Sequence, residues 1–176
     1  MLITSDVLRA AAVEHLRYRL KCRLVCTERS PFIRDPCTPD VIGVTDKRKV
    51  IEIELKMSWS DFKANRAKTS LYQRRFYGIR PWRYFFLVPP EMKDRVLAAL
   101  EEGEGLLTIG DGSNVYTGLP KVVSVRPATI DRESRPLALK EIVRMVSHQT
   151  GSLVSALAKV AKLKNPDAVP DEMASI

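Results

Sequence analysis

The chain contains two carboxylates and a lysine whose types and spacing are suited to breaking a phosphodiester bond. Asp40 precedes a run of strand-forming residues, and Glu54 and Lys56 lie two residues apart in the next such run. Carboxylate oxygens are ligands that Mg²⁺ prefers, and a bound cation acidifies the water that attacks phosphorus. A neighbouring lysine can orient or help to deprotonate that water. The sequence therefore predicts a metal-dependent hydrolytic site at these three residues.

The residues around this site predict a β-hairpin that brings the two carboxylates together. Residues 41–45 and 49–55 are rich in β-branched side chains, and a short polar turn joins them. Because successive side chains of a strand point to opposite faces, Glu54 and Lys56 share one face of the second strand. The side chains predicted to face the core from that strand are Ile51, Ile53, Leu55 and Met57. Pairing of the strands places Asp40 near Glu54.

The order and spacing of these residues match a known nuclease signature. Pro39-Asp40 followed by Glu54-Leu55-Lys56 resembles the motif of the PD-(D/E)XK nuclease superfamily, and the likeness covers roughly residues 5–90. Within it the chain resembles archaeal-type Holliday junction resolvases and MmcB-like DNA repair endonucleases. The resemblance implies Mg²⁺, with Mn²⁺ as an alternative, held by Asp40, Glu54 and the Leu55 carbonyl. The resemblance also implies that Lys56 serves the attacking water, which is the nucleophile.

Many members of this superfamily add a glutamate from the first helix, and the resemblance assigns that catalytic role to Glu14. Glu14 lies on a helix predicted from Asp6 to Arg19 with Ser5 as its cap. Glu28, at the end of the first predicted strand, is the alternative. Glu52, on the same face as Glu54, is a further candidate. A plain surface role for any of these carboxylates stays open.

A basic helix predicted from Ser60 to about Tyr77 follows the hairpin and is suited to DNA. Between Asp61 and Arg83 there are seven basic residues and a single acid, with aromatic residues among them. Such a surface can contact phosphates and stack on bases, although a solvated basic face over core aromatics is the alternative. Gln73 and Tyr77 match a Gln-x-x-x-Tyr pattern of RecB-like members. The predicted nucleic-acid-binding residues are Lys63, Arg66, Lys68, Gln73, Arg74, Arg75 and Tyr77.

The remaining pattern alternates strands and helices and predicts an α/β fold. Further strands are predicted at 83–88, 106–109 and 122–125, with a turn at 110–114, and a helix from Pro90 to about Leu100. Two C-terminal helices are predicted, separated at Gly151-Ser152. With the resemblance, we expect a restriction-endonuclease-like α/β/α sandwich with a mixed central sheet. Residues 1–130 would form the nuclease-like core, 131–164 helices packed on or extending it, and 165–176 a flexible tail.

Composition limits the partners and the compartment. A formal charge of +8 and a pI near 9.6 indicate a polyanionic partner, since clustered cations displace counterions from phosphates. The N-terminus lacks the pattern of a signal peptide and no apolar run reaches membrane-spanning length, so we expect a cytoplasmic protein without a membrane partner. Three cysteines do not make a disulfide framework. They are also too few for the four-cysteine iron–sulfur cluster of RecB-like nucleases.

The sequence thus favours a Mg²⁺-dependent deoxyribonuclease acting in DNA repair, recombination or phage and bacterial DNA processing. The alternative is a nucleic-acid-binding module that keeps the nuclease fold without catalysis. A protein interaction domain built on the C-terminal helices is a third interpretation. Homo-oligomerisation stays open.

Overall fold

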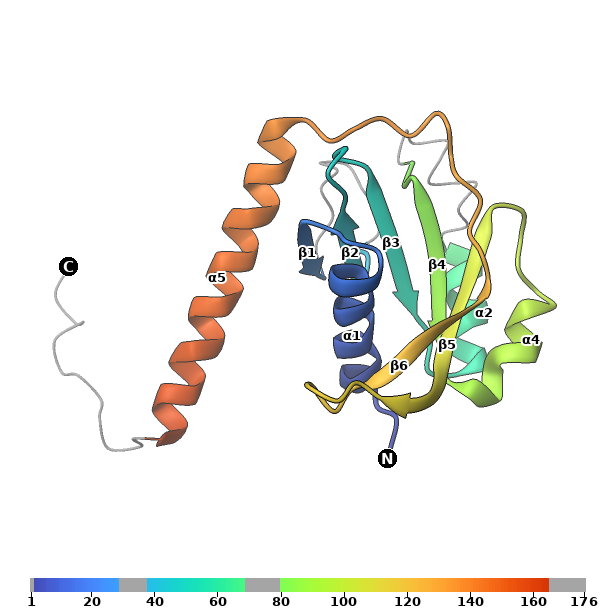
Figure 1. Ribbon diagram of the computed structural model, residues 1–176, viewed down its shortest axis with the longest axis horizontal. Helices are drawn as coiled ribbons and strands as arrows, with labels where there is room; N and C mark the ends of the chain where they lie inside the picture. The colour runs from blue at the N-terminus through green and yellow to red at the C-terminus, as the bar shows by residue number, and fades with distance from the viewer. Residues whose placement is uncertain (1, 29–37, 69–79, 165–176) are drawn as a thin grey trace, which may run out of the picture.

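The sheet is mixed and the helices lie on both of its faces (Figure 1). The computed structural model describes residues 2–28, 38–68 and 80–164. The strands are β1 (Leu24–Thr27), β2 (Val41–Val44), β3 (Val50–Leu55), β4 (Arg83–Val88), β5 (Glu104–Ser113) and β6 (Pro120–Arg126). The helical segments are α1 (Ser5–Glu14), η1 (His15–Arg19), α2 (Trp59–Lys68), η2 (Pro90–Met92), α4 (Lys93–Leu97) and α5 (Leu139–Lys164).

The strands pair in chain order, so β3 and β4 occupy the centre of the six-stranded sheet. The β3–β4 and β4–β5 pairs are parallel, and the other pairs are antiparallel. A parallel pair requires a crossover, and α2 provides one between β3 and β4 while η2 and α4 provide the next. The predicted α/β sandwich with a mixed central sheet is confirmed.

The predicted hairpin is formed by β2 and β3. Val41 pairs with Ile53 and Val44 with Val50, in antiparallel register. The core-facing prediction is also confirmed, because Ile51, Ile53 and Leu55 are buried. The opposite face of β3 is buried too, since helices cover both sides of the sheet. Charged side chains on β3 therefore lie in the interior.

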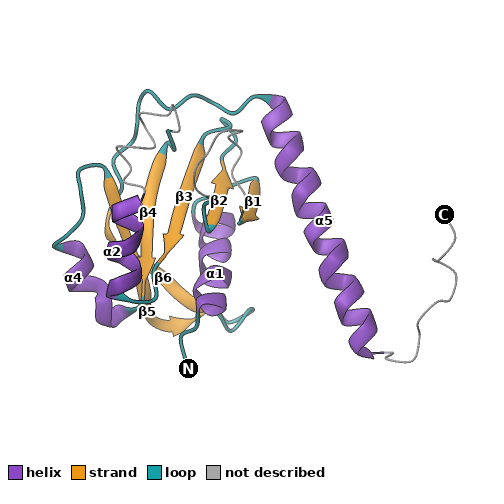
Figure 2. Ribbon diagram, turned by 180° about the vertical axis from the view of Figure 1, so that it is seen from behind, coloured by secondary structure: helices purple, strands orange, loops and turns teal. Residues whose placement is uncertain are grey.

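Two apolar layers hold the sheet between the helices. On one side, α1 packs through Leu8, Ala11 and Ala12 against a cluster that includes Ile53 and Leu107. On the other side, Phe62 of α2 and residues of the η2–α4 segment pack against β4 and β5. Figure 2 shows α2 and α4 in front of the sheet and α1 behind it. The two faces of β3 therefore meet different helices.

The first helix begins and ends differently from its prediction. Thr4, in an extended conformation, is the N-cap, and its Oγ1 accepts a hydrogen bond from the Val7 amide at 3.3 Å. Ser5 is already inside the helix, so its predicted capping role was wrong. The chain widens to a π-turn over His15–Arg19, where the Leu20 amide donates to the His15 carbonyl.

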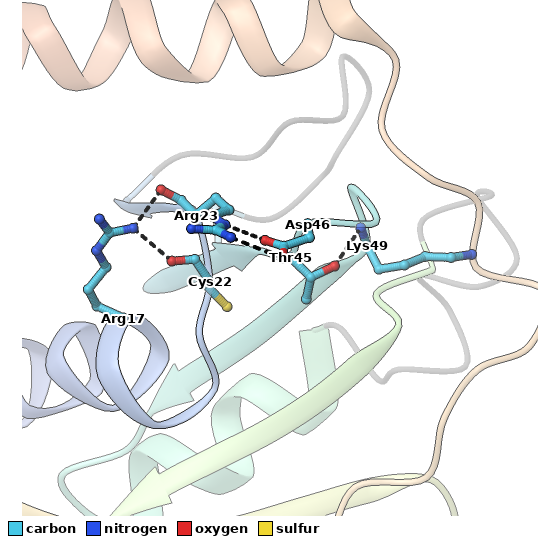
Figure 3. Close-up of polar contacts among 6 residues, drawn as sticks. All are labelled: Arg17, Cys22, Arg23, Thr45, Asp46 and Lys49. Carbon is cyan, nitrogen blue, oxygen red and sulfur yellow. Dashed lines mark hydrogen bonds and ion pairs between the residues drawn. The ribbon is translucent and has the colours of Figure 1, made fainter.

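Hydrogen bonds and an ion pair join the end of η1 to the β2–β3 turn (Figure 3). Arg17 donates to the carbonyls of Cys22 and Arg23 at 3.0 and 2.9 Å. The Arg23 guanidinium pairs with Asp46, within the turn that joins β2 to β3. The chain passes so close to β2 here that a Cβ on Gly43 would lie 2.5 Å from Cys22 Sγ. Strand β1 and the hairpin are thereby fixed to each other at this end.

The predicted turn at 110–114 was wrong in position. Strand β5 continues to Ser113, and the turn lies at residues 115–117. The β5–β6 register shifts between Ile109 and Ser113, so the glycine-rich stretch forms an irregularity within the strand pair instead of its end. Gly112 takes a φ of +78°, which a glycine adopts without strain.

The C-terminal part is one helix and not the predicted two. Helix α5 runs without a break through Gly151. Its first turns pack through Ile142 and Met145 against Cys26 and Ile42. Beyond them it extends away from the sheet (Figure 1). Within the described residues, no helix is both long and apolar enough to span a membrane.

Replacing Gly151 by alanine should stabilise the outer half of α5. A Cβ at this position would meet nothing within 4 Å, and alanine is about 1 kcal/mol more favourable than glycine inside a helix. Circular dichroism at 222 nm should show more helix, and the amides around residue 151 should exchange more slowly with deuterium. Ser155→Ala, at another exposed position of α5, should give a smaller gain. Unchanged exchange in Gly151→Ala would mean that the glycine does not limit the helix.

Candidate functional site

The β2–β3 register places the two signature carboxylates opposite each other. Val41 pairs with Ile53, so the next position along the hairpin sets Asp40 against Glu54. The Leu55 amide donates a hydrogen bond to Asp40 Oδ2 at 2.8 Å, which fixes the aspartate against the end of β3. Asp40 is half-buried and follows the buried Pro39. The hairpin therefore brings together the carboxylates that the sequence predicted to meet.

Lys56 completes this group on the same face of the sheet. Its Nζ lies 2.9 Å from Glu54 Oε1, and its side chain is only 6% exposed. The backbone is held in place because the Lys56 amide donates to the Leu87 carbonyl of β4 at 3.1 Å. We call Asp40, Glu54 and Lys56 the carboxylate–lysine cluster.

The alternation of β3 determines which side of the sheet the cluster occupies. Ile51, Ile53 and Leu55 belong to the apolar layer that contains α1. Glu54 and Lys56 must therefore project to the other side, where α2 lies (Figure 2).

Asp61 of α2 is a neighbour of the cluster that sequence reasoning did not assign to the site. Its Oδ1 lies 3.8 Å from Lys56 Nζ, and its amide donates to Ser58 Oγ at 3.2 Å. Ser58 caps α2, so the cap sets the position of Asp61 in the first turn. The sequence contained a signal for this contact, because a serine three residues before an acid is typical of a helix N-terminus.

Burial and charge raise the pKa of Glu54 to about 7. The largest cause is desolvation of the carboxylate, followed by repulsion from Asp40. The ammonium of Lys56 opposes both effects, and Glu52 adds further repulsion. Glu54 therefore changes its charge near neutral pH, which is unusual for a glutamate and is typical of functional sites.

Glu14 makes its hydrogen bonds outside the carboxylate–lysine cluster. Its two carboxylate oxygens accept hydrogen bonds from Asn114 Nδ2 and Thr117 Oγ1, both at 2.6 Å, in the β5–β6 turn. It lies at the end of α1, and α1 covers the face of the sheet opposite to the one toward which Glu54 projects. Sequence patterns do not predict these contacts, because each hydrogen bond joins residues about a hundred positions apart. The contacts of Glu14 thus tie α1 to the β5–β6 turn.

Glu28, the alternative, is close to Asp40 through the backbone. Its amide donates to the Asp40 carbonyl at 3.0 Å, which continues the β1–β2 pairing. The left-handed conformation of Glu28, with a φ of +52°, turns the chain at this point. Its side chain pairs with Arg9 of α1 at 3.1 Å. The further acid whose charge acts on Glu54 is Glu52, which is completely buried on the same face of β3.

The donor set fits a magnesium ion that keeps most of its water. Among the residues that the structure describes, no three His, Cys, Asp or Glu side chains form a group that could hold a metal ion. A Mg²⁺ ion, however, is commonly held by one or two carboxylates together with several waters. Asp40 and Glu54 supply such a pair, and their mutual repulsion in the absence of a cation favours binding of one.

The predicted DNA-binding residues lie only partly in the described region. Lys63 is exposed on α2, while Arg66 and Lys68 belong to the same helix. Four of the predicted contacts lie outside the described residues, namely Gln73, Arg74, Arg75 and Tyr77. Phe62 is buried, and its ring packs edge-on against Phe86. Phe62 is therefore a core residue and is not available to stack on bases.

Comparisons with known proteins bear on the fold alone. No known protein family matches the chain, and no curated protein matches it. A solved structure described as the SPO1766 protein of unknown function from Silicibacter pomeroyi is similar, with a TM-score of 0.56 and 21% sequence identity. The similarity covers 97% of this chain and 98% of that chain.

The raised pKa of Glu54 should make stability depend on pH between about 4.5 and about 7. In this window the folded protein retains a proton that the unfolded chain loses, so the contribution of Glu54 favours unfolding increasingly as pH rises. Relative to the parent, Glu54→Gln should gain stability through this window, to a limit on the order of 3 kcal/mol above pH 7. Urea unfolding at closely spaced pH values measures the difference.

Glu102→Gln, on an exposed turn, is the matched control and should follow the pH dependence of the parent. If the free energies of unfolding of Glu54→Gln and the parent change in parallel across the same pH range, the Glu54 carboxylate does not titrate near 7.

Proposed function

We propose that this protein is a Mg²⁺-dependent deoxyribonuclease of the PD-(D/E)XK type. Asp40, Glu54 and the Leu55 carbonyl would hold the cation, and Lys56 would serve the attacking water. The observation that carries the proposal is the position of Asp40 opposite Glu54, with Lys56 Nζ 2.9 Å from the glutamate. The order in which the chain supplies these residues is that of the superfamily signature.

The energetic cost of the cluster supports a functional role. Two carboxylates placed side by side and largely buried repel each other, and the folded protein must bear that cost. Lys56 pairs with Glu54, and the same ammonium lies 3.8 Å from Asp61. Apolar side chains at these positions would pack between β3 and α2 without such a cost. A cation bound by the pair would remove the repulsion.

Each residue near the proposed cation would have its own role in the chemistry. Bound Mg²⁺ would supply the Lewis acidity that lowers the pKa of water and offsets charge on the phosphorus. Asp40 is oriented for this task by the Leu55 amide, which leaves its second oxygen available for the cation. Lys56 is positioned through its backbone bond to Leu87 and can hold a water near Glu54. Asp61 Oδ1, 3.8 Å from Lys56 Nζ, would remain a partner for the lysine with Glu54 bound to the cation.

DNA is the proposed substrate because the chain is strongly basic. The formal charge of +8 and the lysines and arginines between residues 61 and 83 would attract phosphates. Exposed Lys63 lies on this helix, which is adjacent to the cluster through Asp61. Repair, recombination or phage and bacterial DNA processing are the proposed settings.

A nucleic-acid-binding module without catalysis is the second candidate. It is favoured by the close pairing of Lys56 with Glu54, both of which have little exposed surface. Such a pair could be a structural element that needs no cation. Titration calorimetry with MgCl₂ and MnCl₂ separates the two functions, since heat of binding that disappears in Asp40→Ala is expected only for the nuclease.

Substitutions in the cluster should abolish or slow the cutting of DNA. Asp40→Ala and Glu54→Ala should leave no Mg²⁺-dependent cleavage, because either change removes half of the carboxylate pair. Lys56→Ala should cut roughly 10²–10⁴-fold more slowly, as expected for the loss of a positioned acid–base group. Ca²⁺ should support DNA binding with little cleavage, since its looser oxygen shell orients water poorly. Linear, circular, flap and four-way DNA with Mg²⁺ provide the assay.

Lys47→Ala and Asp111→Ala are matched controls, because each removes the same kind of charge from an exposed position outside the cluster. Both should cut at the parental rate, and circular dichroism should show every variant folded. A folded Asp40→Ala protein that cuts as fast as the parent would place any activity elsewhere.

The basic segment after Lys63 should dock the DNA. Replacing Arg74 and Arg75 together by alanine should weaken binding to every sequence and reduce the salt slope of the affinity by up to about two units. The double variant Lys47→Ala with Arg132→Ala removes the same charge from exposed positions elsewhere and should change the slope less. Fluorescence anisotropy over a range of KCl concentrations measures both. Equal slopes for the two double variants would exclude this segment as the docking surface.

A further inference from the structure

Helix α5 carries a continuous apolar stripe that the described residues leave open to solvent. Leu153 and Leu157 are 58 and 59% exposed, and Leu139 is 70% exposed. The stripe consists of Leu139, Val143, Val146, Thr150, Leu153 and Leu157. Ile142 and Met145, in contrast, pack against the sheet. The stripe therefore lies on a side of α5 that does not serve to fix the helix to its own domain.

The spacing of the stripe identifies the kind of surface it is. Its members follow one another at alternating intervals of four and three residues, which is a period of 3.5. On a straight helix with 3.6 residues per turn, a seven-residue repeat drifts by about 20° per heptad, and supercoiling with a partner removes this drift. The stripe has the pattern of a coiled-coil seam nearly three heptads long.

We propose that α5 pairs with α5 of a second copy of this chain as a parallel two-stranded coiled coil. The first core position of the repeat holds Val143, Thr150 and Leu157, and the second holds Leu139, Val146 and Leu153. β-Branched residues at the first position with leucine at the second favour two parallel strands.

Thr150 is compatible with a buried position in this seam. Its Oγ1 donates to the Val146 carbonyl at 3.0 Å, four residues earlier in the same helix. The hydroxyl is thus satisfied within its own chain and would not be buried without a partner. The γ-methyl group remains available for packing.

The charges that flank the stripe favour a second copy over other partners. The positions beside the seam are Lys140, Ile142, Ser147, Gln149, Val154 and Ala156, and one of these six residues is charged. Two copies can therefore approach without the like-charge repulsion that prevents self-pairing, and an oppositely charged helix would gain little. A membrane-surface helix would carry lysine and arginine along its polar flanks, and Lys140 is the single such residue at these six positions.

The size of the seam sets the expected affinity. Leu139 to Leu157 spans roughly 27 Å at 1.5 Å per residue, and a helix is roughly 10 Å wide. Each copy would contribute a few hundred Å², which is near the lower end of specific interfaces. We expect reversible dimerisation in the micromolar range.

Sedimentation equilibrium of the full chain from low to high micromolar concentration tests the proposal. The parent should show a monomer–dimer equilibrium, and Leu153→Asp should raise the dissociation constant by more than about tenfold, because each copy places a charge in the seam. Ser155→Asp is the matched control, with the same new charge at an exposed position outside the stripe, and should leave the equilibrium close to that of the parent. Circular dichroism should show α5 intact in both variants.

Oxidative cross-linking tests the orientation. A Leu157→Cys substitution in a Cys37→Ser background should form a disulfide-linked dimer, because parallel helices bring the two copies of residue 157 together. The native Cys22 and Cys26 are buried and should not compete. The proposal is overturned if the chain stays monomeric throughout, if Leu153→Asp dimerises like the parent, or if residue 157 fails to cross-link. A monomer that sediments with anionic lipid vesicles would assign the stripe to a membrane surface instead.

Discussion

The burial of charge on the central strand is the constraint on which the rest of the structure depends. Strand β3 is covered on both faces, yet one face carries Glu52, Glu54 and Lys56. Each of these groups must be compensated, because an unpaired charge in the interior is costly. Lys56 pairs with Glu54, Asp61 at the start of α2 lies 3.8 Å from the same ammonium, and the Leu55 amide holds Asp40 beside them. The hairpin register that apolar packing selects therefore places two carboxylates side by side, and the Lys56 ammonium offsets part of their repulsion.

Local pattern predicted this part of the molecule well. The alternation of β3 and its short turn determine both the register with β2 and the face of every side chain, so the meeting of Asp40 with Glu54 could be predicted from sequence alone. Strand β4 was likewise predicted at the observed bounds, because a run of apolar and aromatic residues ends at two prolines. These features depend on residues that are close together in the chain.

The sequence was less informative where distant contacts decide the structure. The partners of Glu14 lie in the β5–β6 turn, and the ion pair of Glu28 with Arg9 turns that side chain toward α1. The continuity of α5 through Gly151 has a local cause, since a glycine lowers helix stability without interrupting the hydrogen bonds. In β5 the glycines mark a register shift, and composition alone does not distinguish such a shift from a turn.

The first turns of α5 are attached to the β2–β3 hairpin through apolar contacts. Leu137 and Met145 share an apolar cluster with Ile42 and Val50, which belong to the hairpin that carries the carboxylates. A change at Met145 would therefore disturb β2 and β3 together with the helix, and its effects on association and on the cluster could not be separated. The stripe residues of α5 are exposed instead and do not belong to that apolar cluster. We therefore expect that substitutions in the stripe test the proposed self-association without altering the carboxylate–lysine cluster.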